Sequence, residues 1–291
     1  MIAILAVSVV AGGCSRDTSN GEVASSTTSI VATTVAEVAP AEQSFVPPDY
    51  ESFMTDDGRT RSYRIVDLSG GQPAPLILVL HGFGGTAEAM RTYTGIEDVV
   101  ASSLDEGAVI VYPNGTGVDS GLPQSWNAGG CCPFSIYEMV DDVAFLGQLI
   151  DRTTAAYDID TERVWVIGHS NGGMMAYRLA CELSTRVTAI GVAAGAMMID
   201  SCRPSRAVNA LHLHGDLDEV VPLAGGELAG IVFPSAQQSF ERFAAANSCV
   251  VNDVGADCPS GTTVVLQTNP TWTHDWQPDW TSTFLEFLSR Q

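Results

Sequence analysis

Apolar positions along this chain follow two alternating patterns. Short runs rich in Val, Ile and Leu are typical of buried strands, whereas longer segments with apolar residues three and four positions apart are typical of helices. Strands that alternate with helices predict an α/β fold with a mostly parallel central sheet and helices on both faces. Strands are expected at 61–67, 76–81, 108–112, 163–169, 188–194, 209–214 and 262–267. Helices are expected at 86–103, 137–156, 171–183, 235–247 and 280–289.

The N-terminal segment has a different pattern. Residues 1–13 are apolar but fall short of the roughly 20 residues that cross a bilayer, which is typical of a signal peptide. The small residues AGG directly before Cys14 resemble a bacterial lipobox, so we expect this cysteine to be lipidated. Residues 14–46 are dominated by Ser, Thr, Ala and Val and are expected to form a flexible linker. Ordinary secretion and a plain N-terminal strand or helix are the alternatives.

The remaining residues, 47–291, are expected to form one catalytic domain, and their charge limits its partners. The chain has a formal net charge of −21, and all 13 basic residues are arginine. Such a surface excludes nucleic acid as a partner and repels anionic lipid, so contact with a membrane is expected only through the lipid anchor. A neutral or apolar substrate fits this charge better than a phosphorylated one.

Cysteine usage indicates an oxidising compartment. Seven cysteines are present, and removal of the lipidated one leaves six, an even number that predicts disulfides in an exported domain. Cys249 and Cys258 flank a short polar loop and are the natural local pair. Adjacent cysteines can bridge each other only through a strained ring, so Cys131 and Cys132 are expected to pair with Cys181 and Cys202 in either order. Zinc is the competing interpretation, but paired C-x-x-C knuckles are missing.

A G-x-S-x-G motif occupies residues 168–172, between a predicted strand and a predicted helix. A sharp turn at this place exposes the serine oxygen above the sheet, as in the nucleophile elbow of α/β-hydrolases. The motif therefore predicts Ser170 as a nucleophile. A glycine-rich start of a helix is the alternative without function.

In this fold the acid and then the histidine follow the serine along the chain. The chain has five histidines, and only His274 lies after the candidate acids, so it is predicted to be the general base. Asp218, in the loop after the predicted strand 209–214, is the preferred acid, with Asp216 as the alternative. The acid would hold the imidazole tautomer and stabilise the imidazolium.

An oxyanion requires two preorganised N–H donors. Residues 81–85, HGFGG, follow a predicted strand and resemble a glycine turn that offers one donor, assigned to Phe83, and Asn171 after the nucleophile offers the other. Trp126 and Trp276 are expected to border an aromatic substrate cleft, because an indole offers a broad apolar face. A simple turn and ordinary core packing are the alternatives.

Several of these segments carry a family resemblance when they are taken together. The stretches YPNGTG (112–117), SWNAGGCC (125–132), VDDVAFLGQLID (140–151), GHSNGGMMAYRLACE (168–182) and HGDLDEVVP (214–222) resemble the secreted esterase and polyhydroxybutyrate-depolymerase family, which includes feruloyl and acetylxylan esterases. The resemblance implies an α/β-hydrolase fold, hydrolysis of short-chain, aryl or polyhydroxyalkanoate esters without a cofactor, and Ser170, Asp218 and His274 as the triad.

Other functions remain open on the same residues. His212 and His214 mimic the start of a metallohydrolase motif, but Leu217 stands where a third histidine is required, so no metal is expected. A non-catalytic binding protein of the same fold, a peptidase and a thioesterase are further alternatives, because a fold does not fix a function.

Overall fold

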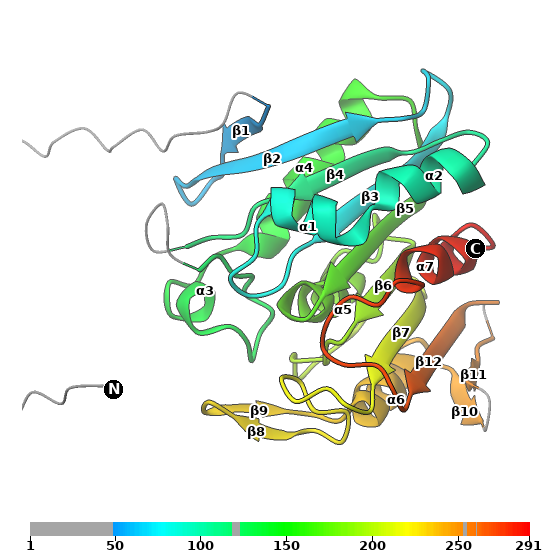
Figure 1. Ribbon diagram of the computed structural model, residues 1–291. Helices are drawn as coiled ribbons and strands as arrows, with labels where there is room; N and C mark the ends of the chain where they lie inside the picture. The colour runs from blue at the N-terminus through cyan, green and yellow to red at the C-terminus, as the bar shows by residue number, and fades with distance from the viewer. Residues whose placement is uncertain (1–48, 118–122, 253–254, 260) are drawn as a thin grey trace, which may run out of the picture. The chain divides into compact units, whose positions relative to one another are not determined.

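The computed structural model describes residues 49–117, 123–252, 255–259 and 261–291 (Figure 1). All of them belong to the unit Gln43–Gln291, which contains the predicted catalytic domain 47–291. The predicted signal peptide 1–13, Cys14 and the predicted linker 14–46 lie outside the described residues.

Ten strands of the described chain form one sheet in the order β1-β2-β4-β3-β5-β6-β7-β12-β11-β10 (Figure 1). Neighbours from β4 to β12 in this order are parallel, and the pairs at both edges are antiparallel. The strands of the sheet are β1 (Glu51–Met54), β2 (Thr60–Asp67), β3 (Ala74–Leu80), β4 (Val109–Pro113), β5 (Ile159–His169), β6 (Ala189–Ala193), β7 (Asn209–Gly215), β10 (Val250–Asn252), β11 (Gly255–Asp257) and β12 (Thr263–Asn269). A separate hairpin consists of β8 (Gly226–Leu228) and β9 (Ile231–Phe233).

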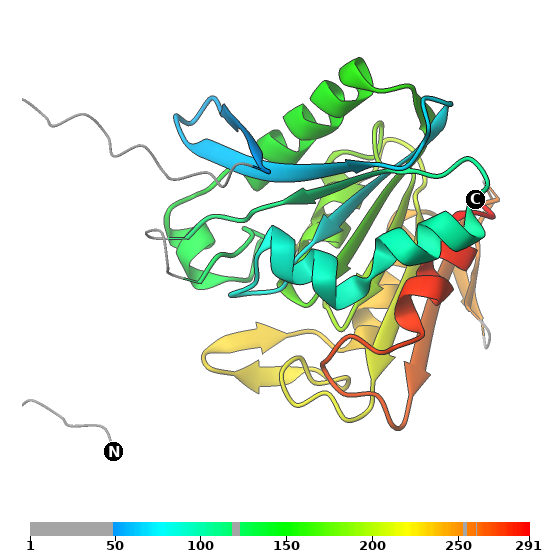
Figure 2. The ribbon, with the colours of Figure 1, turned by 45° about the horizontal axis from the view of Figure 1, so that its top comes forward.

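Helices cover both faces of this sheet (Figure 2). Successive side chains of a strand point to opposite faces, so in β3 Leu76, Leu78 and Leu80 join one buried cluster, while Ile77 and Val79 join the other. The first cluster includes residues of α4, α5 and α6, and the second includes residues of α1, α2 and α7. The helices are α1 (Ala87–Thr94), α2 (Ile96–Ser103), α3 (Pro133–Tyr137), α4 (Asp142–Ala156), α5 (Asn171–Glu182), α6 (Ala236–Ala246) and α7 (Trp280–Leu288).

The predicted α/β class is confirmed, and each predicted strand and helix has a counterpart in the structure. Two boundaries differ for local reasons. The helix expected at 86–103 is broken at Gly95, whose φ of 57° ends α1 and starts α2. The helix expected at 137–156 begins only at Asp142, because the Asp141 side chain caps it by accepting a hydrogen bond from the Ala144 N–H at 2.9 Å.

The parallel centre of the sheet determines where functional side chains meet. The carboxyl ends of β3, β5, β7 and β12 lie at one edge of the sheet, because these strands run in the same direction. Residues 81–85, Ser170, Asp218 and His274 each follow one of these strands, so four loops that are distant in sequence share one edge. Among the described residues, no helix is long and apolar enough to cross a membrane.

Candidate active site

Ser170 occupies the turn between β5 and α5. Its φ of 53° and ψ of −119° are sparsely populated for a residue with a side chain. Its N–H donates to the carbonyl of Ala193 at 2.8 Å, which ties the turn to β6. A Cβ at Gly168 would lie 2.1 Å from the Gly172 carbonyl oxygen, and a Cβ at Gly172 would lie 2.3 Å from the Leu80 carbonyl oxygen. Both glycines of the motif are therefore required by close backbone approach around the serine.

The acid and the base come from the loops after β7 and β12. The Nδ1 atom of His274 lies 2.8 Å from Oδ2 of Asp218, whose other oxygen accepts from the N–H groups of Val220 at 2.9 Å and Val221 at 2.8 Å. Asp218 is buried, whereas Asp216 is exposed. The geometry thus joins His274 to Asp218, the preferred acid.

Contacts to Asp218 determine its ionisation. Burial on its own raises the pKa of this carboxyl, but the contacts from His214 and His274 outweigh burial and hold the pKa well below its usual value. The carboxylate is therefore ionised at neutral pH. An ionised acceptor on Nδ1 places the remaining imidazole proton there and leaves Nε2 of neutral His274 free to accept a proton.

His169, the residue before the serine, connects the elbow to the loop of His274. Its Nε2 lies 2.7 Å from the His274 carbonyl oxygen, and the two rings are 4.9 Å apart between centroids. Burial, and then the nearby His274, lower the pKa of His169 to about 4, so the ring is neutral at pH 7 with its proton on Nε2. We did not predict this support from the sequence, although His169 stands inside the motif at 168–172.

The glycine turn after β3 lies against the nucleophile. A Cβ at Gly82 would be 3.3 Å from Cβ of Ser170. The carbonyl of Gly82 accepts from Nδ1 of His81 at 2.7 Å and from the N–H of Gly85 at 3.0 Å. This carbonyl and the N–H of Phe83 belong to one peptide plane, so fixing the carbonyl also fixes the direction of that N–H.

His81 is itself held in one tautomer. Its Nε2 accepts from the N–H of Gly115 at 2.9 Å, so Nδ1 carries the proton. Complete burial lowers the pKa of His81 to about 4, which keeps the ring neutral. The second predicted donor, the N–H of Asn171, is the first in α5 and has no acceptor within the helix. The two expected oxyanion donors thus come from the two turns that flank Ser170.

The side chain of Asn171 binds the loop 123–132. Its Oδ1 accepts from the N–H of Trp126 at 2.7 Å, and its Nδ2 donates to the Trp126 carbonyl at 3.0 Å. The Trp126 indole has no exposed surface, and its N–H donates to the His81 carbonyl at 2.9 Å. The expectation that Trp126 borders the substrate cleft is therefore wrong, because the hydrogen-bonded indole packs beneath the turn after β3.

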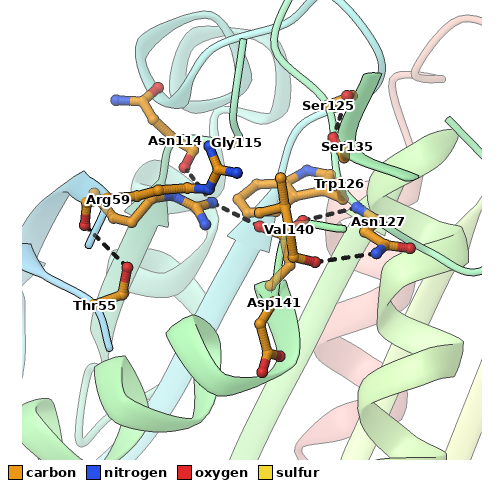
Figure 3. A network of polar contacts seen from close by, with 12 residues as sticks. Thr55, Arg59, Asn114, Gly115, Ser125, Trp126, Asn127, Ser135, Val140 and Asp141 are labelled. Atoms are coloured by element: carbon orange, nitrogen blue, oxygen red, sulfur yellow. Dashed lines mark hydrogen bonds and ion pairs between the residues drawn. The ribbon is translucent and has the colours of Figure 1, made fainter. Parts of the chain in front are cut away.

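A buried ion pair supports the same loop from the other side. Arg61 donates to Asp142 at 2.7 Å, with both side chains almost completely buried, and the second Asp142 oxygen accepts from the Asn127 N–H at 2.7 Å. Figure 3 shows the Asn127 side chain donating to the Val140 carbonyl, at 3.0 Å, and the contact between the hydroxyls of Ser125 and Ser135. These contacts hold the loop whose backbone, at Trp126, is hydrogen-bonded to the Asn171 side chain.

Three disulfides are present in the described chain, and two of them correct the predicted pairing. Cys249–Cys258 is confirmed. Cys131 bonds to its neighbour Cys132, and Cys181 bonds to Cys202. The prediction rejected the neighbouring pair because of its ring, yet a cis peptide between these residues brings their Cα atoms to 3.0 Å.

Trp276 lies beside the base loop. Its ring centroid is 6.3 Å from that of His169 and 6.5 Å from that of Tyr93, and its N–H donates to Thr281 Oγ1 at 3.0 Å. The side chain is partly buried, so one part of the indole packs on α7 and another part remains accessible. A role for Trp276 in substrate binding remains a prediction.

Within the described residues, no group of three or more His, Cys, Asp or Glu side chains is arranged to hold a metal ion. His212 and His214, which resembled the start of a metal motif, contact each other at 3.0 Å through ring nitrogens. Nε2 of His214 lies 2.8 Å from the Val221 carbonyl oxygen.

The chain is similar in sequence to known proteins. The family model described as phospholipase/carboxylesterase matches residues 62–246. NocK, a protein with an esterase name from Nocardia uniformis subsp. tsuyamanensis, is 35% identical over 176 residues, which cover 58% of this chain and 48% of NocK. Feruloyl esterase B from Piromyces equi is 28% identical over 192 residues, which cover 62% of this chain and 34% of that protein. The chain thus matches about half or less of the length of these relatives.

Solved structures show the same fold. Esterase PE8 superposes with a TM-score of 0.58 at 18% identity, covering 79% of this chain and 98% of that one. Acetyl xylan esterase from Aspergillus awamori superposes with a TM-score of 0.56 at 13% identity, covering 79% of this chain and 94% of that one. These similarities confirm the predicted α/β-hydrolase fold.

Proposed function

Because the chain belongs to the phospholipase/carboxylesterase family, we propose that it is a serine hydrolase of carboxylic esters that works through an acyl-enzyme. The observation that carries this proposal is the contact of His274 with buried Asp218 beside the strained turn of Ser170. Esterase and feruloyl esterase names among its relatives support an ester as the substrate.

In the proposed mechanism, Nε2 of His274 takes the proton from the Ser170 hydroxyl as its oxygen attacks the ester carbonyl. Asp218 holds the His274 tautomer and stabilises the imidazolium that forms. The N–H groups of Phe83 and Asn171 stabilise the negative charge on the carbonyl oxygen. His274 then protonates the leaving alkoxide, and water releases the acid from Ser170 by the same steps.

We further propose short-chain, aryl (feruloyl-type) or polyhydroxyalkanoate esters as substrates. The Phe83 side chain is 54% exposed on the turn that lies against Ser170, and Leu217, next to the acid, is 55% exposed. Together with Trp276 they offer apolar surface at the loops that carry the triad, and such surface suits a neutral acyl or aryl group.

Ser170→Ala and His274→Ala should each reduce kcat by roughly 10³-fold or more, because each removes a member of the triad. The measurement is hydrolysis of p-nitrophenyl esters from acetate to palmitate, methyl ferulate and short hydroxybutyrate oligomers, with circular dichroism to check folding. EDTA treatment of the wild type is the control for metal dependence. Activity close to wild type in a folded Ser170→Ala variant would exclude the acyl-enzyme, and an optimum at twelve carbons or more would overturn the substrate class.

We also propose that the domain is exported and held at the cell envelope through a lipidated Cys14. Three disulfides in the described chain support an oxidising compartment. In a bacterial host, Cys14→Ala should move the protein from the membrane fraction to the soluble fraction, because acylation requires the thiol. An unchanged distribution between the two fractions would contradict the anchor.

A further inference from the structure

A buried chain of polar side chains runs from α5 to the proposed catalytic acid. The Tyr177 hydroxyl lies 3.0 Å from Nδ1 of His212, and Nε2 of His212 lies 3.0 Å from Nδ1 of His214. Nε2 of His214 lies 2.8 Å from the Val221 carbonyl oxygen and 3.3 Å from Oδ2 of Asp218. Tyr177, His212 and His214 are each 1% exposed. None of the three has a part in the mechanism above.

The partners determine where the protons of this chain lie. A carbonyl oxygen only accepts, so Nε2 of His214 carries a proton, which leaves Nδ1 to accept from Nε2 of His212. Burial, and then the neighbouring His214, hold the pKa of His212 well below its usual value, although a backbone contact with Gly195 opposes them. Burial raises the pKa of Tyr177, so its hydroxyl keeps its proton and donates to Nδ1 of His212.

Every hydrogen bond of the chain then points towards Asp218. Among the described residues, the titratable groups in contact with His214 are His212 on the same strand and Asp218, which also binds His274. From the helices, Tyr177 of α5 contacts His212, and Phe243 of α6 packs edge-on against Tyr177 without a charge. A reversal of one ring would leave two buried donors facing each other without an acceptor, which is unfavourable.

We propose that His214 is a positioning residue for the acid, held in one tautomer by Tyr177 and His212. Its N–H binds the Val221 carbonyl and lies against Oδ2, while the N–H groups of Val220 and Val221 hold Oδ1. His214 thereby secures the turn 218–221 and fixes the plane of the carboxylate that His274 uses. This inference rests on the proposed role of Asp218 and His274.

The arrangement has an electrostatic consequence for the base. The positive end of the His214 N–H dipole lies against Oδ2 of Asp218 and partly offsets its negative charge. The same oxygen stabilises the His274 imidazolium. Without that N–H, Oδ2 of Asp218 interacts with His274 alone, while Oδ1 keeps its bonds from Val220 and Val221. The pKa of His274 should therefore rise when the donor is removed, and a merely structural role for His214 would not produce this shift.

The test compares His214→Leu, which removes the donor, with His214→Gln, whose carboxamide N–H can take the place of Nε2–H. NMR titration of the imidazole nitrogens gives the pKa of His274 in both variants without an assay of activity. We expect a rise of roughly half a unit or more in His214→Leu and the wild-type value in His214→Gln. Kinetically, kcat should fall about ten-fold in His214→Leu with KM unchanged, and the acidic limb of kcat/KM should move to higher pH.

The same spectra of the wild type should show the proton of His212 on Nε2 and a proton on Nε2 of His214. This measurement decides the proposal if His214→Leu does not fold, since a proton on Nδ1 of either ring would overturn it. An unshifted His274 in folded His214→Leu, or equal shifts in both variants, would also overturn it. Failure of the triad is distinguishable, because an active Ser170→Ala variant refutes the mechanism while these NMR results stand.

Discussion

At the scale of single residues, the His81 side chain fixes the peptide plane that carries one proposed oxyanion donor. Its Nδ1–H holds the Gly82 carbonyl, and the same peptide plane carries the N–H of Phe83, the proposed oxyanion donor. His81→Leu should lower kcat by roughly ten- to a hundred-fold, because loss of one oxyanion donor outright costs about 10²–10³. His81→Asn, which keeps a donor near Nδ1, is the matched control and should lose less. Equal steady-state rates for both variants on p-nitrophenyl acetate would show that the hydrogen bond has no such effect.

The sequence is informative about single residues only where the chemistry imposes an order along the chain. The proposed triad could be chosen because the fold requires serine, acid and histidine in that order and only His274 satisfies the last position. Trp126 shows the limit, since an indole in a loop can face a cleft or fill a core, and here it binds the His81 carbonyl from beneath. His169 and His214 were missed for a similar reason, because their roles depend on carbonyls that come from distant loops.

At the scale of elements, alanine substitutions at two helical glycines can test the close backbone approach at the turn of Ser170. A Cβ at Gly172 in α5 would lie 2.3 Å from the Leu80 carbonyl oxygen, which belongs to the backbone of β3 and cannot move alone. A Cβ at Gly147 in α4 would meet only Leu183 methyl groups, at 3.4 Å and beyond. We expect Gly172→Ala to lower the free energy of unfolding by about 1–3 kcal/mol or more. Gly147→Ala should be neutral or raise it by up to about 1 kcal/mol, because alanine favours a helix. Urea denaturation measures both, and equal stabilities would contradict the close approach.

Secondary-structure prediction succeeded for elements whose burial gives the sequence an apolar pattern, and it failed for exposed elements without such a pattern. Strands β3, β4 and β6 are buried along their whole length and appear in the sequence as continuous apolar runs. The three-residue strands β8 and β10 are fully exposed, so they carry no apolar pattern that a sequence could reveal. In the loop 123–132, no periodicity indicates that the adjacent cysteines bond to each other.

At the scale of the whole molecule, a high negative charge coexists with a neutral, histidine-rich interior. Several of the described arginines form ion pairs at the surface, but such pairs contribute little, and the pair Arg61–Asp142 is a buried exception. His81, His169 and His212 are buried in neutral form, since burial lowers the pKa of each ring. The stability of the fold should therefore depend on pH through histidines rather than through the many exposed carboxylates.

The sign and window of this dependence follow from His81 and His169. Their ordinary pKa is 6.5 and their pKa in the folded chain is about 4, so between these values the unfolded chain binds protons that the folded chain does not. The free energy of unfolding should therefore fall as the pH falls from about 6.5 to 4, by up to about 3 kcal/mol for each ring, since one unit corresponds to 1.36 kcal/mol. Asp218 acts in a different window, because its lowered pKa contributes stability that is lost only below about 3.9.

Urea denaturation between pH 4.5 and 7.5 measures the predicted slope. His169→Gln is the informative variant, because its carboxamide can donate to the His274 carbonyl in place of Nε2–H but cannot take up a proton. Its free energy of unfolding should fall less steeply with acid than that of the wild type. The difference should equal the contribution predicted for one buried histidine. The variant also separates this cause from general repulsion among surface charges, which it leaves unchanged. Parallel curves for the two proteins would mean that His169 has the same pKa in the folded and unfolded chain, and that its burial does not govern the acid lability of the fold.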